Sequence, residues 1–449
     1  MIIFLAILLI LVLGFTAYFI IQRGIGAIYS NPLVLGTLFF GIIHLLLPLM
    51  QINSDYFRYQ EEYSIITILV SIILVVVGQL VFMVFFSRFK LDYYQVFKDV
   101  KGRNKEVRRI LNINIFIFLV GAYFSYKNLS VILSIGVTEY LRDRISHGQG
   151  KGIQILFAHW SYLSAFIFIF CYFLATRKKL KRRALFFTII SILVSVTYYT
   201  LNSNRNSIFT MLLIIGGAWL INNKMLNTKL NKKQAKIIGA ISFALIIAFT
   251  LFFNIGKERY ALYASRHKEF KYSLVKSLNG AFGNHENIMW LLENDHEKLW
   301  GQTYVAGFTN LVPRSMWPNK PLGAGPKLKN FIDPGSYVIG GQRNSSLTTG
   351  FFTELQMNYG VVGMVAFPIG IAILIGFLLK RLNRSKYIIV RMTSFFTAIM
   401  FATMFYYAEF LGFYSRFFIS IIPFFIIYFF VGIRFKLKKS NTKLNTISS

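Results

Sequence analysis

The feature that most constrains this chain is a series of long apolar stretches separated by short polar or basic segments. A transmembrane helix needs about 20 mostly apolar residues to cross about 30 Å of hydrocarbon. Eleven stretches of the sequence approach or reach that length. They are residues 2–22, 31–50, 65–87, 110–125, 153–175, 184–201, 207–222, 236–254, 359–379, 387–408 and 411–433. The sequence therefore predicts an all-α, polytopic integral membrane protein.

Composition excludes the other broad classes of protein. The 449 residues are 55% apolar with a mean hydropathy of +0.55, whereas soluble domains are about 45–50% apolar. The single cysteine, Cys171, lies inside an apolar stretch, so neither a disulfide framework nor a cysteine-based metal or catalytic site is expected. The first stretch lacks a basic leading region and a small-residue cleavage site, so we interpret it as a retained helix.

The basic residues are placed unevenly along the chain. More than half of the 49 Lys and Arg residues lie in five segments that fall on one side of the membrane under the eleven-span arrangement. These segments are residues 88–109, 177–183, 224–236, 380–386 and the tail after 434. Because positive loops remain cytoplasmic, the N-terminus is expected outside and the C-terminus inside. The net charge of +32 is then an orientation signal that also attracts lipid headgroups, and no nucleic-acid partner is expected.

One long segment, residues 255–358, is predicted to lie outside the membrane between the eighth and ninth spans. It divides the chain into a region of eight spans (1–254), this external segment, three further spans (359–433) and a basic cytoplasmic tail (434–449). Helical spacing of apolar residues is visible only over about 272–292, and the rest is expected to be loop. Its tryptophans argue against disorder, which leaves function as the reason for so long a loop.

A second external segment, residues 127–152, is amphipathic. It is expected either to lie in the membrane interface or to be a plain connecting helix.

Basic residues in the long external segment run against the orientation rule and are candidates for anion binding. Arg314 and Arg343 are flanked by Pro, Gly and Asn, and Lys320 lies nearby. A guanidinium group can bind phosphate or pyrophosphate through two hydrogen bonds. The alternative is that these residues are solvated surface charges.

Other charges lie near the outer ends of spans. Arg205 belongs to the turn Asn-Ser-Asn-Arg-Asn-Ser at 202–207, and Arg416 lies about five residues into the last span, seven residues after Glu409. Ionisable groups in the membrane are costly, which makes them functional candidates. An ion pair with Glu409 or with another helix, or snorkelling to the interface, is the alternative for Arg416.

Two stretches resemble a known family. The sequence Val-Pro-Arg-Ser-Met-Trp-Pro-Asn-Lys-Pro at 312–321 resembles the external loop of Wzy-type oligosaccharide repeat unit polymerases. The sequence Ser-Ser-Leu-Thr-Thr-Gly-Phe-Phe-Thr-Glu-Leu-Gln-Met-Asn-Tyr-Gly-Val-Val-Gly at 345–363 is similar to that family's entry into the next helix. The Arg205 turn also matches a polar, Arg-containing turn of the family.

The resemblance implies a GT-C-like fold and a reaction at the outer face of the bacterial cytoplasmic membrane. These enzymes join undecaprenyl-pyrophosphate-linked oligosaccharide units into O-antigen, capsule or exopolysaccharide. The growing chain leaves its lipid pyrophosphate and is transferred to an incoming unit. A Wzx-type flippase and a chain-length regulator are the partners expected for the family. Without a P-loop, a G-x-G-x-x-G motif or a metal-binding cluster, no cofactor is expected.

Such a reaction needs cations for the leaving pyrophosphate and a general base for the acceptor hydroxyl. The candidate cations are Arg205, Arg314, Arg343 and Arg416. The base is either Glu354 or His285, which the sequence leaves open. Further candidates are Lys320, Glu409 and, for stacking against sugars, Trp317 with Trp290, Trp300 and Tyr337.

Two other functions stay open at this point. A ligase of the O-antigen type would share the donor chemistry and differ only in the acceptor, and the Trp-Pro-Asn-Lys-Pro element favours the polymerase. A flippase or transporter of the lipid-linked unit would place charges near the middle of the membrane and often shows internal repeats. No repeat is visible and the polar residues gather at the outer ends of the spans, which favours an enzyme.

Overall fold

The computed structural model describes residues 1–142, 152–202, 205–229, 274–282, 284–310, 312, 314–339 and 346–444, with isolated positions between 231 and 254. In this part of the chain the regular elements are helices, and nine of them are long and apolar enough to cross a membrane. The predicted all-α, multi-pass membrane architecture is therefore confirmed. The predicted span at 236–254 lies largely outside the described residues.

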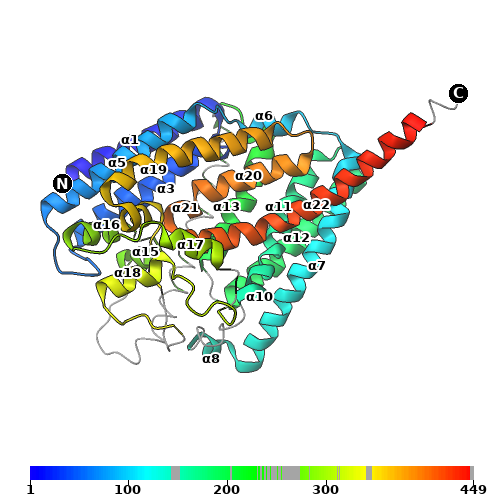
Figure 1. Cartoon of the computed structure of the whole chain (residues 1–449). Helices are drawn as coiled ribbons and strands as arrows, with labels where there is room; N and C mark the ends of the chain where they lie inside the picture. The colour runs from blue at the N-terminus through cyan, green and yellow to red at the C-terminus, as the bar shows by residue number, and fades with distance from the viewer. Residues whose placement is uncertain are drawn as a thin grey trace.

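The membrane helices follow the predicted apolar stretches closely. They are α1 (Ile2–Arg23), α3 with η1 and α4 (Pro32–Gly41, Ile42–Leu46 and Leu47–Ser54), α5 (Ile65–Ser87), α7 (Asn104–Ile135), α10 with α11 (Gly152–Ala158 and Trp160–Leu174), α12 (Lys178–Leu201), α19 (Phe351–Asn383), α20 with α21 (Ile388–Ala402 and Met404–Tyr407) and α22 (Phe410–Leu444). The described residues also contain a shorter apolar helix, α13 (Arg205–Asn222). In Figure 1, α1, α5 and α19 lie on one side and α7, α11 and α12 on the other, with α20 between them.

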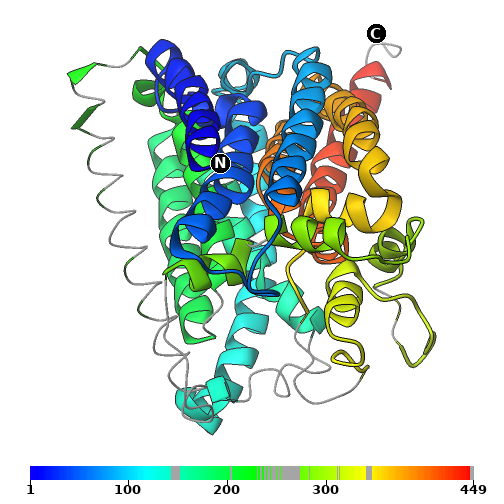
Figure 2. The same ribbon diagram turned by 90° about the vertical axis from the view of Figure 1, so that its left-hand side faces the viewer.

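Figure 2 shows the connecting elements gathered at two ends of the bundle. One end holds α6 (Tyr93–Lys98) and the C-terminal part of α22, and the opposite end holds α8 (Val137–Arg142) and α15 to α18. Arg23, at the end of α1, forms an ion pair with Asp92 at 3.5 Å, and the Gly26 amide donates to the Leu226 carbonyl at 2.8 Å. The turn after α1 therefore lies at the end that carries the basic loops.

The external segment contains more helix than the periodicity predicts. It forms α15 (Leu274–Phe282), α16 (Asn284–Glu293), α17 (Gln302–Thr309) and α18 (Ala324–Ile332). The expectation of loop beyond residue 292 is wrong for α17 and α18, because helices of two turns are too short to produce a visible apolar period. In the other external segment, α7 continues to Ile135 and α8 follows, while residues 143–151 lie outside the described residues.

A break in α19 separates two helical halves. Gly360 has φ 67° and ψ −158° inside this helix, a conformation that glycine tolerates best. The last carbonyls of the first half, those of Met357 and Asn358, accept hydrogen bonds from the amides of Leu299 and Trp300 at 3.0 and 3.1 Å. The first half, which begins eight residues before the predicted span at 359, is thereby tied to the external segment.

The Asn358 side chain strengthens this connection. Its oxygen accepts from the Gly301 amide at 2.8 Å, and its nitrogen donates to the Thr303 hydroxyl at 2.8 Å. The Asn-Tyr-Gly element of the sequence therefore has a structural explanation: Gly360 ends one helical half, and Asn358 fixes the start of α17 against it.

Candidate functional site

Glu354, in the first half of α19, lines a cavity of about 220 Å³ whose walls are mostly aromatic. One carboxylate oxygen, Oε2, accepts a hydrogen bond from the Phe410 amide at 2.7 Å. The other, Oε1, is buried and accepts no close hydrogen bond from a described residue, although the Thr303 side chain lies near enough to the carboxylate to stabilise it. The remaining lining residues are Tyr304, Phe308, Phe351, Tyr359, Phe367, Ile371, Phe405, Ala408 and Phe410. Because a buried polar atom without a partner is costly, Oε1 is available to hydrogen-bond a ligand.

Arg416 and Glu409 line a second, more polar cavity of about 280 Å³. Ala408 contributes to the walls of both cavities, so the two are neighbours. The other lining residues are Ser346, Leu347, Thr348, Met404, Tyr407 and Gly412. In the described part of the chain Arg416 forms no ion pair with a carboxylate. The alternative that Arg416 pairs with Glu409 is therefore wrong, while an ion pair with another part of the chain stays a prediction.

Glu409 has a different partner, which is the beginning of α18. Its Oε2 accepts a hydrogen bond from the Gly325 amide at 2.8 Å. A helix N-terminus favours a negative group. Glycine at position 325 also lets the start of α18 lie close to the backbone of Leu347, since a Cβ on Gly325 would lie 2.3 Å from the Leu347 carbonyl oxygen. Burial raises the pKa of Glu409, and the hydrogen bond from Gly325 opposes that rise. Glu409 therefore anchors α18 against the start of α22.

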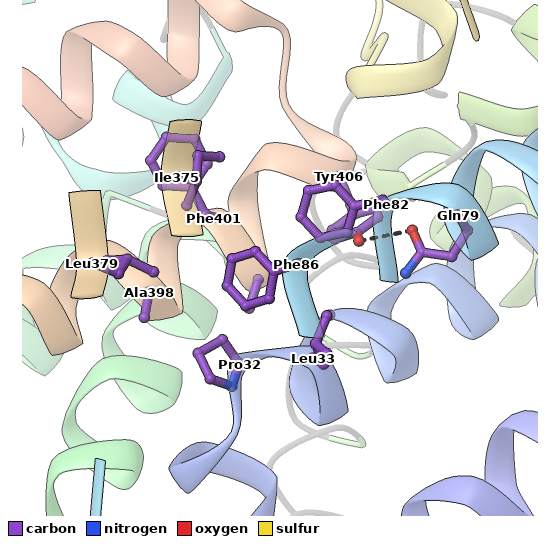
Figure 3. A pocket seen from close by; sticks show the side chains of 12 residues that line it. Pro32, Leu33, Gln79, Phe82, Phe86, Ile375, Leu379, Ala398, Phe401 and Tyr406 are labelled. Atoms are coloured by element: carbon purple, nitrogen blue, oxygen red, sulfur yellow. Dashed lines mark hydrogen bonds between the residues drawn. The ribbon is translucent and has the colours of Figure 1, made fainter. Parts of the chain in front are cut away.

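The segment between the two cavities, α21 and residues 408–409, is fixed from several directions. The Asn284 side chain donates to the Tyr406 carbonyl at 3.0 Å. The Tyr406 hydroxyl donates to Gln79 Oε1 at 2.9 Å, at the edge of a small cavity of about 20 Å³ between α3, α5, α19 and α20 (Figure 3). The Tyr407 hydroxyl lies 3.3 Å from the Thr210 hydroxyl of α13. The wall that separates Glu354 from Arg416 is thus positioned by three other helices.

A polar cluster behind Arg416 was not singled out in the sequence. Three side chains lie close enough to Arg416 to interact electrostatically with its charge, and they are His159, Tyr162 and Tyr199. His159 Nδ1 is also hydrogen-bonded to the Tyr199 hydroxyl. These residues come from α12 and from the junction of α10 and α11. The tyrosine pair just before the polar turn at 202–207 is the sequence signal that could have indicated them.

The side chains of two predicted cations lie outside what the structure describes. Arg205 is the first residue of α13, which begins within the stretch 202–207 that the sequence predicts to be a turn, but its side chain is not among the described ones. Arg343 also lies outside the described residues. The roles predicted for both remain predictions.

Arg314 and Lys320 have partners inside their own loop. Arg314 Nη1 donates to the carbonyls of Pro318 and Lys320 at 2.9 and 3.2 Å. Lys320 Nζ donates to the carbonyls of Asn310 and Val312 at 3.1 and 2.7 Å. Burial and the neighbouring Arg314 charge lower the pKa of Lys320. These hydrogen bonds therefore stabilise the conformation of the Trp-Pro-Asn-Lys-Pro element, in which Trp317 is exposed.

His285 lies away from both cavities and is enclosed by protein. Its Nδ1 is 3.2 Å from His44 Nδ1, and its Nε2 is 3.0 Å from the Ser71 hydroxyl. His44 belongs to η1, a π-helical turn within the second span. Burial lowers the pKa of His285 to about 3, so the imidazole is neutral at physiological pH. Of the two alternatives for a general base, the geometry favours Glu354.

The neighbour of His285, Glu286, is a fully bonded buried carboxylate. Its Oε2 accepts from the side chains of Gln51 and Asn279 at 2.8 and 2.9 Å. Its Oε1 accepts from the Tyr59 amide at 3.0 Å and from the Arg58 amide. Together these two residues hold α16 against the second and third spans, which is a structural role.

Neither a protein-family model, nor a curated protein, nor a solved structure matches the chain. In the part of the chain that the structure describes, no three His, Cys, Asp or Glu side chains come together to hold a metal ion. The chemistry of the site is therefore interpreted from its own geometry. A buried carboxylate and a guanidinium that pairs with no described carboxylate occupy neighbouring cavities, at the end of the bundle opposite the basic loops.

Proposed function

We propose that this protein is a glycosyltransferase that polymerises undecaprenyl-pyrophosphate-linked oligosaccharide units at the outer face of the bacterial cytoplasmic membrane. The observation that carries the proposal is the placement of Glu354 and Arg416 in adjoining cavities that share Ala408. A proton acceptor beside a cation is what transfer from a pyrophosphate to a hydroxyl requires. The resemblance of residues 312–321 and 345–363 to Wzy-type polymerases supplies the substrate.

In the proposed reaction Glu354 receives the proton of the acceptor hydroxyl through Oε1. The acceptor oxygen forms a bond to the anomeric carbon of the growing chain, while the bond from that carbon to the lipid pyrophosphate breaks. The electron pair of the broken bond stays with the pyrophosphate, whose charge Arg416 stabilises. Arg205, which the sequence places near the outer end of a span, is a second candidate for this cation. The aromatic walls around Glu354 offer flat faces for sugar rings.

The wider setting is part of the same proposal. Eleven spans in a GT-C-like arrangement would place the two cavities at the outer surface, where a flippase delivers the lipid-linked unit. A chain-length regulator would then act on the polymer as it grows. Both partners rest on the family resemblance.

The experiment that tests this function uses purified full-length protein and a lipid-pyrophosphate-linked repeat unit, followed by gel analysis. A ladder of lipid-linked products without any other acceptor supports the polymerase. Glu61→Gln and Arg384→Ala, both exposed side chains, are matched controls for Glu354→Gln and Arg416→Ala. Product that forms only after a lipid-core acceptor is added would identify a ligase instead. Movement of the substrate across vesicles without joining would identify a transporter.

A further inference from the structure

Helix α17 turns an apolar face outward in a segment that the sequence predicts to lie in water. Val305 is 48% exposed and Phe308 is 58% exposed, and Trp300 is exposed just before the helix. The opposite face, with Thr303 and Ala306, is buried. A helix whose apolar side faces away from the protein needs a cover other than water.

The position of α17 against α22 shows where that face lies. Gly307 packs directly on the start of α22, since a Cβ there would lie 2.5 Å from the Phe410 ring. The Phe308 ring is 4.7 Å from the ring of Tyr414, and Tyr414 stacks with Phe418 one turn further along at 6.0 Å. Phe418 is exposed on the span itself. The apolar face of α17 therefore continues the outward face of α22, and Figure 1 shows α17 lying beside the start of α22.

The second half of α19 borders α17 on its other side. Val362, two residues after the break, is 76% exposed, and Phe367 is also exposed. The Phe367 ring stacks on Tyr359 at 4.1 Å, and Tyr359 stacks on Tyr304 of α17 at 6.3 Å. Exposed apolar side chains on two spans thus flank the exposed face of α17. The surface that covers those spans in the cell is lipid.

We propose that α17 lies in the outer interface of the membrane, with Val305 and Phe308 in contact with lipid acyl chains and Trp300 at headgroup level. Short amphipathic helices and tryptophans occupy this position in membrane proteins. The cavity that holds Glu354 has Tyr304 and Phe308 of α17 and Phe367 of α19 in its walls. Because Phe308 and Phe367 are both exposed, its mouth opens to the bilayer between these helices. A ligand carried on a lipid therefore enters this cavity sideways from the membrane.

Single cysteine labels can test this placement in liposomes. The native Cys171 is buried, so wild-type protein serves as the unlabelled blank. Val305→Cys and Phe308→Cys would each carry a fluorophore, which is quenched either by a spin-labelled lipid or by aqueous iodide. Leu374→Cys is the lipid reference, because the Leu374 side chain is 67% exposed on α19. Asp333→Cys is the water reference, because Asp333 is exposed just after α18.

The expected result is that labels at 305 and 308 are quenched more by the lipid than by iodide, as at 374, with the opposite order at 333. Labels at 305 and 308 that behave like the label at 333 would overturn the placement. Gln302→Cys, exposed on the same helix, provides a further probe if one variant fails to fold. The readout does not depend on any enzymatic activity, so it stands or falls separately from the proposed polymerase.

Discussion

Glu354 and His285 show how far single residues can be interpreted before their neighbours are known. The sequence marks both as candidate bases, and it marks Arg416 as a charge within a span. The partners of His285, His44 and Ser71, lie 241 and 214 residues away along the chain. No local pattern reveals such contacts, so the sequence leaves the choice of base open. The same holds for Arg314, whose carbonyl partners depend on how its own loop closes.

Glu354→Gln should remove polymer formation while the protein remains folded. The amide oxygen of Gln can still accept from the Phe410 amide, but the side chain no longer takes up a proton. Glu354→Ala should in addition leave a buried donor without a partner, at a cost of about 1–3 kcal/mol in unfolding free energy. Product ladders and thermal unfolding of both variants separate the two effects. Wild-type product lengths from Glu354→Gln would exclude this carboxylate as the base.

Arg416→Ala should lower the rate of polymer formation by about 10²–10³-fold, the usual loss when one preorganised charge-stabilising group is removed. Arg416→Lys should keep part of the activity because it retains the charge without the two-pronged geometry. The rate of product formation at saturating substrate is the measurement. An unchanged rate in Arg416→Ala, beside an equally active Arg384→Ala control, would remove Arg416 from the site.

His285 should make the protein less stable in acid. Because burial lowers its pKa from 6.5 to about 3, the unfolded chain binds a proton below pH 6.5 that the folded protein does not. The contribution of neutral His285 to the free energy of unfolding is therefore complete above pH 6.5. It is lost as the pH falls toward 3, by at most about 1.4 kcal/mol per pH unit. His285→Gln should show a shallower acid slope in thermal unfolding than wild type. Parallel slopes for the two proteins would contradict the buried neutral imidazole.

At the scale of elements, the sequence predicts the long membrane helices but not the short helices between them. The described spans follow the apolar stretches because twenty apolar residues have few alternatives to a membrane helix. The helices α17 and α18 depend on contacts with α22, through Gly307 and through Glu409, that no local period encodes. The break at Gly360 is similar. Its glycine is visible in the sequence, but its position at a kink depends on the loop at 299–301.

Gly350→Ala should be strongly destabilising, and Gly370→Ala should not. Gly350 precedes α19 with φ 76°, and a Cβ there would lie 2.2 Å from the Tyr406 carbonyl oxygen, which belongs to the backbone and cannot move aside easily. Gly370 lies in the same helix, where a Cβ would meet nothing within 4 Å. The amount of folded protein in membranes and its thermal stability in detergent are the readouts. Similar stability of the two variants would contradict the tight contact between α19 and α21.

For the whole molecule, the distribution of charge predicts which end faces the cytoplasm. The structure collects the basic loops at one end and α15 to α18 at the other (Figure 2), and the physical basis for assigning sides is the excess of Lys and Arg in cytoplasmic loops. A topology reporter fused after Lys329 should read external, and one fused after Arg182 should read cytoplasmic. The reverse pattern would place the Arg416 cavity inside the cell and remove the proposed reaction from the outer face.

The bonds of Glu286 also set an order for biogenesis. The turn at residues 58–59 emerges early in synthesis, yet its amides are satisfied by a carboxylate 228 and 227 residues later. At a synthesis rate of about 5–20 residues per second, the turn waits roughly 10–50 s for its partner. During that time the amides of this turn have no carboxylate partner from α16. The turn can therefore form its final hydrogen bonds only after α16 has been synthesised, which makes this part of the assembly a late, long-range event.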